Sequence, residues 1–178
     1  MKFGGTSVAG IEKLKNIANI VSKEVKNYKV VVVLSAMAGE TNKLQGYLDD
    51  LNVQNSIESD LVLTSGEQIT CGLLSAALKN LGVKSTPLLG WQIPIITDDN
   101  YEKAKILKID KSRIDKYFKE KDVIVLAGFQ GINLNGHITS LGRGGSDTTA
   151  VAIASSIDAE RCDIYTDVEG VYTTDPNI

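Results

Sequence analysis

Three glycines, one arginine and one carboxylate gather in the segment from Leu141 to Ala150. Glycines let the backbone approach a ligand closely and turn successive N–H groups towards it. Arg143 adds a planar guanidinium that suits the oxygens of a carboxylate or phosphate, and the apolar helix that follows adds its positive end. This combination predicts a binding site for an anion, with Asp147 beside it.

The other end of the chain carries a second glycine element, Lys2–Ser7, in which a lysine stands shortly before two adjacent glycines. Two such loops indicate two charged ligands or one long ligand. The alternative is that the glycines only form turns, because glycine makes up 16 of the 178 residues. We favour anion binding because Lys2, Arg143 and Asp147 accompany the glycines.

Two familiar nucleotide-binding loops do not fit this spacing. The sequence has no G-x-x-x-x-G-K-[ST] element, and the run from Gly142 has Asp147 where a dinucleotide fingerprint has Gly or Ala.

Composition limits the class of protein. A chain of 178 residues with 43% hydrophobic content is long enough to bury one core, so we expect a single globular domain. The net charge of −3 and the scattered lysines disfavour nucleic acid as a partner. We see no segment of transmembrane length and no signal peptide, so we expect no membrane partner and a cytoplasmic location.

Histidine and cysteine chemistry is also disfavoured. His137 is the only histidine and lies in an expected hairpin, so imidazole metal sites and Ser-His-Asp or Cys-His catalysis lack parts. Cys71 and Cys162 lie far apart among apolar or small residues, which predicts buried free thiols rather than a disulfide or metal site.

Hydrophobic periodicity predicts alternating helices and strands. Continuous apolar runs at 30–34 and 123–128 are typical of strands covered on both faces, and Asn135-Gly136 is a strong hairpin signal. Ser146 or Asp147 is expected to cap the helix that follows the glycine loop. The other expected helices span about 10–26, 61–81 and 112–120, the capped helix continues through Ala150 to Ser156, and further strands span 84–89 and 162–166.

These elements predict an α/β fold: a three-layer αβα sandwich with a mostly parallel central sheet. Ligands of such sheets collect beyond the carboxyl ends of the strands. We expect both glycine loops and the turn at Ser35 to lie there.

Seven motifs taken together resemble the aspartokinases, which have the amino-acid kinase fold. They cover nearly the whole chain in the family's order, and the ordered set is specific although each motif alone is weak. The motifs are Lys2–Val8, Leu34–Gly39, Thr64–Glu67, Gly90–Gln92, Gly128–Gly131, the Arg143 loop and Thr166–Pro176.

The resemblance implies ATP-dependent phosphorylation of the side-chain carboxylate of L-aspartate to 4-phospho-L-aspartate, in the synthesis of lysine, threonine and methionine. It implies ATP and Mg²⁺ as cofactors, L-aspartate as the small-molecule partner and a homo-oligomer. A carboxylate with a pKa of about 3.9 is already ionised at neutral pH, so the transfer needs no general base. Alignment and charge neutralisation are the main requirements.

The resemblance also implies roles for individual residues. Lys2 and Asp147 would be catalytic. Substrate would bind to residues on both sides of the site, namely Thr41, Glu67, Arg143, Gly144, Gly145 and Ser146. Nucleotide would bind to the N-terminal loop and a later turn, namely Lys2, Phe3, Gly4, Gly5, Thr166, Asp167 and Tyr172.

The sequence departs from the family pattern at two positions and in its length. Only Met1 precedes Lys2 where the family has an apolar strand, and Asn177 stands where the family has an arginine after the Asp-Pro pair. We expect residues 1–178 to form an amino-acid kinase domain without the C-terminal part of the catalytic domain and without the regulatory ACT domains. Two alternatives therefore stay open: a catalytically impaired nucleotide-binding fragment or partner subunit, and a kinase of the same fold with another acceptor.

Overall fold

A parallel five-stranded sheet forms the centre of the protein, for which a computed structural model describes residues 1–166. All neighbouring strands of this sheet run parallel, which confirms the expected mostly parallel central sheet. In spatial order the strands are β3 (Ser85–Leu88), β6 (Val123–Ala127), β2 (Val30–Leu34), β1 (Lys2–Phe3) and β9 (Ile164–Tyr165).

Successive residues of β2 and β6 alternate between two hydrophobic cores. Val30, Val32 and Leu34 point to one face, whereas Val31 and Val33 point to the other. All five residues of each strand are buried, because side chains on a strand alternate in direction and both faces are covered. The continuous apolar runs in the sequence therefore form strands that are covered on both faces, as predicted.

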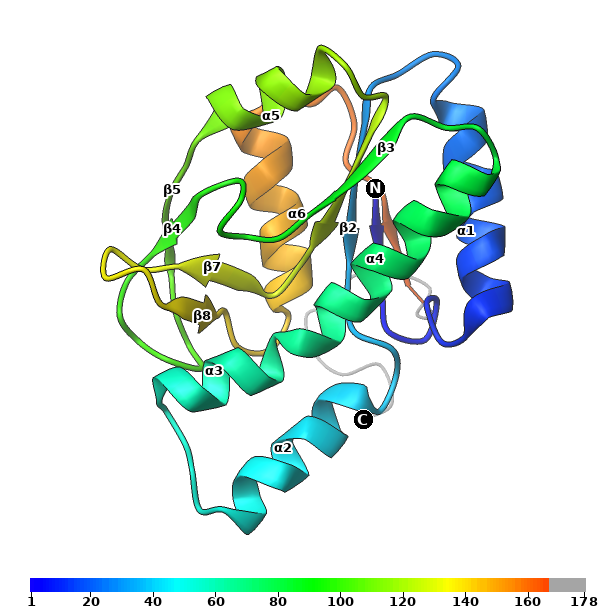
Figure 1. Cartoon of the computed structure of the whole chain (residues 1–178). Helices are drawn as coiled ribbons and strands as arrows, with labels where there is room; N and C mark the ends of the chain where they lie inside the picture. The colour runs from blue at the N-terminus through cyan, green and yellow to red at the C-terminus, as the bar shows by residue number, and fades with distance from the viewer. Residues whose placement is uncertain (167–178) are drawn as a thin grey trace, which may run out of the picture.

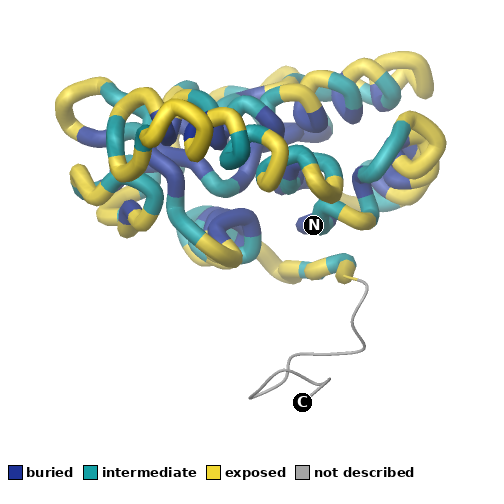
Figure 2. The backbone as a smooth tube through the Cα atoms, turned by 90° about the horizontal axis from the view of Figure 1, so that it is seen from below, coloured by how far each residue is buried: buried dark blue, intermediate teal, exposed yellow. Residues whose placement is uncertain are grey.

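Two pairs of helices cover the sheet and complete the three layers (Figure 1). Helices α1 (Ile11–Glu24) and α4 (Ser65–Asn80) pack on one face, and α5 (Lys111–Phe118) and α6 (Gly145–Ser156) pack on the other. Seen from below, exposed residues follow the outer turns of the helices and buried segments lie between them (Figure 2).

A second, smaller sheet lies beside α6 and carries the predicted hairpin (Figure 1). Strands β7 (Gln130–Ile132) and β8 (Ile138–Ser140) pair antiparallel around Asn135-Gly136, with Gly136 at φ 82°. The other two strands, β4 (Ile95–Thr97) and β5 (Ile106–Ile109), were not among the expected elements.

The helix expected over 61–81 is two helices, α3 (Ile57–Leu63) and α4, joined at Thr64. The carbonyl of Thr64 accepts a hydrogen bond from Gln130 Nε2 at 3.2 Å, and its hydroxyl donates to the carbonyl of Asp60. The bond from Gln130 comes from a segment 66 residues away, so the residues around Thr64 carry no signal of this break. A further helix, α2 (Glu40–Asp50), precedes α3 and was also not predicted.

Three smaller expectations were wrong. The segment Ile57–Asn80, which comprises α3 and α4, is long and apolar enough to cross a membrane by length and composition, and half of its most apolar window is buried inside the protein. Helix α6 begins after Gly144, in the left-handed region, with no side-chain cap from Ser146 or Asp147. Cys71 is a buried free thiol as expected, whereas Cys162 is exposed.

Candidate active site

A cavity of about 750 Å³ lies where the carboxyl ends of β1, β2 and β6 meet the start of α6. Parallel strands end on the same side of a sheet, so the loops that follow them converge there. Residues 2 and 143 come from opposite ends of the chain and line this one cavity. The other predicted residues that line it are Gly5, Ser35, Thr41, Glu67, Gly144, Gly145, Ser146 and Asp147.

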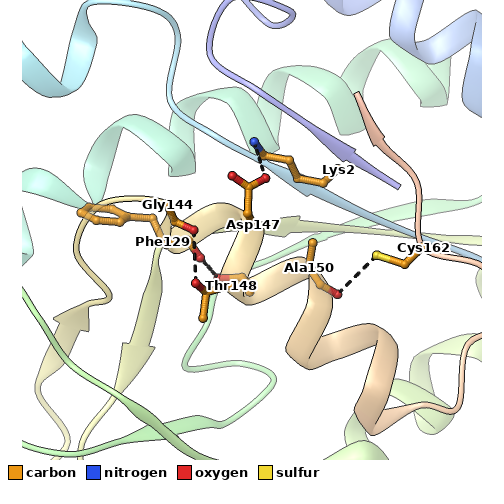
Figure 3. A network of polar contacts seen from close by, with 9 residues as sticks. Lys2, Phe129, Gly144, Asp147, Thr148, Ala150 and Cys162 are labelled. Atoms are coloured by element: carbon orange, nitrogen blue, oxygen red, sulfur yellow. Dashed lines mark hydrogen bonds and ion pairs between the residues drawn. The ribbon is translucent and has the colours of Figure 1, made fainter. Parts of the chain in front are cut away.

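Lys2 and Asp147 form an ion pair on the wall of the cavity. Lys2 reaches from β1 towards the first turn of α6, and its Nζ lies 2.8 Å from Asp147 Oδ1 (Figure 3). The lysine side chain is 9% exposed and the aspartate side chain is 47% exposed. The pair therefore presents a nearly buried ammonium and a partly open carboxylate to a ligand in the cavity.

The N-terminal glycine loop approaches the loop after β2 closely. A Cβ atom on Gly5 would lie 2.9 Å from the carbonyl oxygen of Ala36, so no larger residue fits without a shift. The N–H of Gly4 donates to the carbonyl of Tyr165 and is therefore used within the protein.

The glycine loop around Arg143 has the backbone that only glycine adopts easily. Gly142 and Gly144 have φ values of 74° and 70°, and they flank Arg143 directly. The guanidinium is exposed to the cavity, and no carboxylate within residues 1–166 lies at ion-pair distance from it. Next to it, the buried Gly145 and Ser146 begin α6, so the positive end of that helix faces the cavity.

Glu67 lies on the opposite wall, in the first turn of α4, and is 3% exposed. Its Oε1 accepts the N–H of Ala36 at 3.0 Å, whereas its Oε2 is buried and has no hydrogen-bond partner among the described residues. Burial raises the pKa of Glu67 to about 7, although the bond from Ala36 opposes this shift. An unpaired buried carboxylate oxygen beside a cavity is suited to a cationic group of a ligand.

Several other residues of the cavity wall were not among the predicted site residues. Glu102 and Phe129 both have positive φ values, of 63° and 66°, and both line the cavity together with Lys103. Left-handed backbone is costly for an aromatic residue, so its use at Phe129 reflects the tight turn between β6 and β7. The continuous apolar run at 123–128 predicts the strand but not this turn.

The remaining residues that were predicted to contact the nucleotide do not all lie at the cavity. The Phe3 side chain is buried in the core and stacks on Tyr165, with ring centroids 4.4 Å apart, so only its backbone adjoins the loop. Thr166 is exposed and directly follows Tyr165, whose carbonyl accepts the Gly4 N–H. Asp167 and Tyr172 lie outside the described residues.

Comparison with known sequences now gives the family. Residues 1–178 match the sequence model of the amino acid kinase family. The chain belongs to that family. It is 48% identical over 182 residues to an aspartokinase of Rickettsia conorii, an alignment that covers 99% of this chain and 45% of the relative.

Solved amino acid kinases share the same fold. E. coli aspartokinase III in complex with aspartate and ADP superposes with a TM-score of 0.80 at 27% identity, over 99% of this chain and 50% of that one. Aspartate kinase from Synechocystis superposes with a TM-score of 0.80 at 38% identity, over 99% of this chain and 29% of that one. This amino acid kinase chain thus spans half or less of the length of these relatives.

Proposed function

We propose that this protein transfers the γ-phosphoryl group of ATP to the side-chain carboxylate of L-aspartate and releases ADP and 4-phospho-L-aspartate. The observation that carries the proposal is the single cavity shared by the Lys2–Asp147 pair, Arg143 and Glu67. Its charges match a ligand with two anionic ends and one cationic group, lying against a phosphate chain.

Each group of L-aspartate has a partner in this arrangement. Arg143 pairs with the α-carboxylate through its guanidinium, which accounts for its lack of a carboxylate partner within residues 1–166. Glu67 Oε2 accepts from the α-ammonium, and Thr41 adds a hydroxyl on the same side of the cavity. The side-chain carboxylate then faces Lys2.

The chemistry requires alignment rather than proton removal. An oxygen of the ionised acceptor carboxylate forms a bond to the γ-phosphorus while the bond to the β,γ-bridging oxygen breaks and ADP leaves. Lys2 neutralises charge on the transferred group, and Asp147 holds the Lys2 ammonium in position at 2.8 Å. The start of α6 and the backbone of the N-terminal loop provide further donors for phosphate oxygens.

Asp147 and the phosphates of ATP would hold Mg²⁺ in this site. Within residues 1–166 no three acidic, histidine or cysteine side chains gather to hold a metal ion. This fits Mg²⁺, which is commonly held by substrate phosphates with one or two carboxylates, here the partly open Asp147. The ion supplies charge neutralisation on the phosphate chain when it is bound.

The wider role follows from the relatives. The aspartokinase names and the complex of E. coli aspartokinase III with aspartate and ADP support L-aspartate as acceptor and ATP as donor. With this activity we propose a role in the synthesis of lysine, threonine and methionine, a cytoplasmic location and a homo-oligomer, as the resemblance to the aspartokinases implies. The chain spans 45% of the length of its R. conorii relative. The second candidate is a catalytically impaired nucleotide-binding fragment or partner subunit of a full-length aspartokinase.

An acceptor panel tests the proposal. ADP release from Mg·ATP is measured with L-aspartate, L-glutamate or carbamate, and hydroxylamine traps any acyl phosphate. We expect ADP and trapped product with L-aspartate alone, and neither with Lys2→Ala. ADP binding by a folded chain that forms no product with any acceptor would leave the second candidate, and product with another acceptor would replace L-aspartate.

A further inference from the structure

Asp60 is a buried carboxylate with no place in the proposed reaction. It lies in α3, is fully buried and does not line the cavity. Three donors satisfy it: the Glu102 N–H at 2.9 Å and the Ser140 hydroxyl at 2.6 Å bind Oδ1, and the Ser140 N–H binds Oδ2 at 2.8 Å. No lysine or arginine within residues 1–166 lies at ion-pair distance from it.

The donors to Asp60 belong to two segments of the cavity wall. Ser140 ends β8, which lies beside α3, and stands three residues before Arg143 (Figure 1). Glu102 lies in the loop before β5, and the carbonyl of Ser140 accepts the N–H of Ala104 from the same loop. Both Ser140 and Glu102 line the cavity. One carboxylate therefore joins α3 to the loop that carries Arg143 and to the loop beside it.

Asp60 is also connected to Glu67, which lies on the other wall. The carbonyl of Asp60 accepts the hydroxyl of Thr64 at 2.8 Å, and the carbonyl of Thr64 accepts Gln130 Nε2 at 3.2 Å. Helix α4, with Glu67 in its first turn, begins directly after Thr64. Residues 60–67 therefore form one hydrogen-bonded unit that connects Glu67 to the loop of Arg143, the two residues proposed to bind the acceptor.

Burial raises the pKa of Asp60, and the hydrogen bonds from Ser140 and Glu102 oppose that shift. Burying a carboxylate without a nearby cation has a large desolvation cost, so this residue is unfavourable as simple core packing. Its directed bonds instead fix the orientation of three segments relative to one another, which an apolar side chain would not do.

We propose that Asp60 is a positioning residue for the acceptor, which sets the distance between Arg143 and Glu67 by holding Ser140 against the α3–α4 junction. This inference rests on the proposed function for its ligand, L-aspartate, but its geometric part stands on the hydrogen bonds alone. Within residues 1–166 no hydrogen bond joins Lys2 or the N-terminal glycine loop directly to Asp60 or Ser140, so we expect nucleotide binding to change less than acceptor binding when Asp60 is replaced.

The test uses Asp60→Asn and Ser140→Ala in the 178-residue chain. Asp110→Asn and Ser112→Ala are matched controls, because Asp110 accepts the N–H and hydroxyl of Ser112 at 3.0 and 2.6 Å at the exposed start of α5. Circular dichroism checks folding, hydrogen exchange reports on residues 138–146, and calorimetry gives Kd for L-aspartate and for ADP.

We expect Asp60→Asn to speed exchange in residues 138–146 and to raise the Kd of L-aspartate about tenfold, with the Kd of ADP changed less than about twofold. Ser140→Ala should act in the same direction, and it carries the test if Asp60→Asn does not fold. Unchanged exchange in folded variants, or equal losses of L-aspartate and ADP binding, would overturn the proposal. If the unmodified chain binds ADP but no L-aspartate, the proposed function fails, while the exchange result still decides whether Asp60 holds the loop.

Discussion

The ammonium of Lys2 lies 2.8 Å from the carboxylate of Asp147, although the two residues stand near opposite ends of the described chain. The central sheet brings them together, because the start of α6 contacts β1 at the carboxyl ends of the parallel strands. The pair holds the nearly buried ammonium of Lys2 in a fixed position on the cavity wall and leaves the carboxylate of Asp147 partly open. The proposed reaction depends on this arrangement.

Replacing Lys2 by alanine should lower aspartate-dependent phosphoryl transfer by roughly 100-fold, since a fixed cation at the transferred group stabilises the charge of the transition state. The trapped acyl phosphate gives the measurement. Lys15→Ala is the matched control, because Lys15 forms an exposed ion pair with Glu12 at 2.7 Å and lies outside the cavity. Equal losses in both variants would remove Lys2 from the mechanism.

Arg143→Lys should weaken L-aspartate binding about tenfold while leaving ADP binding nearly unchanged. Lysine keeps the charge but loses the planar fork that binds both oxygens of a carboxylate. Calorimetric titration of each ligand measures the effect. Arg113→Lys, on the exposed side of α5, controls for the loss of a guanidinium elsewhere. An unchanged Kd for L-aspartate in Arg143→Lys would place the acceptor's carboxylate elsewhere.

The affinity for L-aspartate should fall as the pH is lowered below about 7. Burial raises the pKa of Glu67 to about 7, and only the ionised carboxylate attracts the ammonium of the ligand. Glu67→Gln should bind more weakly above pH 7 and should lose most of the pH dependence. Titrations at several pH values check this, with the exposed Glu120→Gln as control. A pH profile that is the same in Glu67→Gln and the unmodified chain would contradict the assignment.

The same residue makes folding stability depend on pH. The pKa of Glu67 rises from an ordinary 4.5 to about 7 on folding, so between these values the folded chain keeps a proton that the unfolded chain has lost. Stability from this group is therefore present below about pH 4.5 and falls as the pH rises to 7. Above pH 7, Glu67→Gln should raise the free energy of unfolding by up to about 3 kcal/mol. Urea unfolding on both sides of this window measures it, and a less stable Glu67→Gln above pH 7 would refute it.

Sequence patterns predicted the structural features that are determined by residues close together in the sequence. The apolar runs of β2 and β6 and the hairpin at Asn135-Gly136 are local signals, and the structure confirms them. The break at Thr64 and the left-handed turn at Phe129 depend on contacts with distant segments, so no local pattern indicates them. The burial of Glu67 also depends on contacts with distant segments. Only the family resemblance indicated this residue.

Gly5→Ala should weaken ADP binding, because the new Cβ would lie 2.9 Å from the carbonyl oxygen of Ala36 and would push the N-terminal loop away. We expect a rise of about tenfold in the Kd of ADP, measured by calorimetry. Gly72→Ala is the control, since nothing lies within 4 Å of its Cβ position in α4, and alanine there should slightly stabilise the helix. Tight ADP binding by Gly5→Ala would show that the close approach does not shape the nucleotide site.

A crystal structure of the chain with Mg·ADP and L-aspartate tests the central claim most directly. We predict L-aspartate in the cavity between Arg143 and Glu67, with its α-carboxylate on the guanidinium, its ammonium on Glu67 Oε2 and its side-chain carboxylate towards Lys2. L-Aspartate bound outside this cavity, or bound in it with its ammonium facing Lys2, would contradict the account.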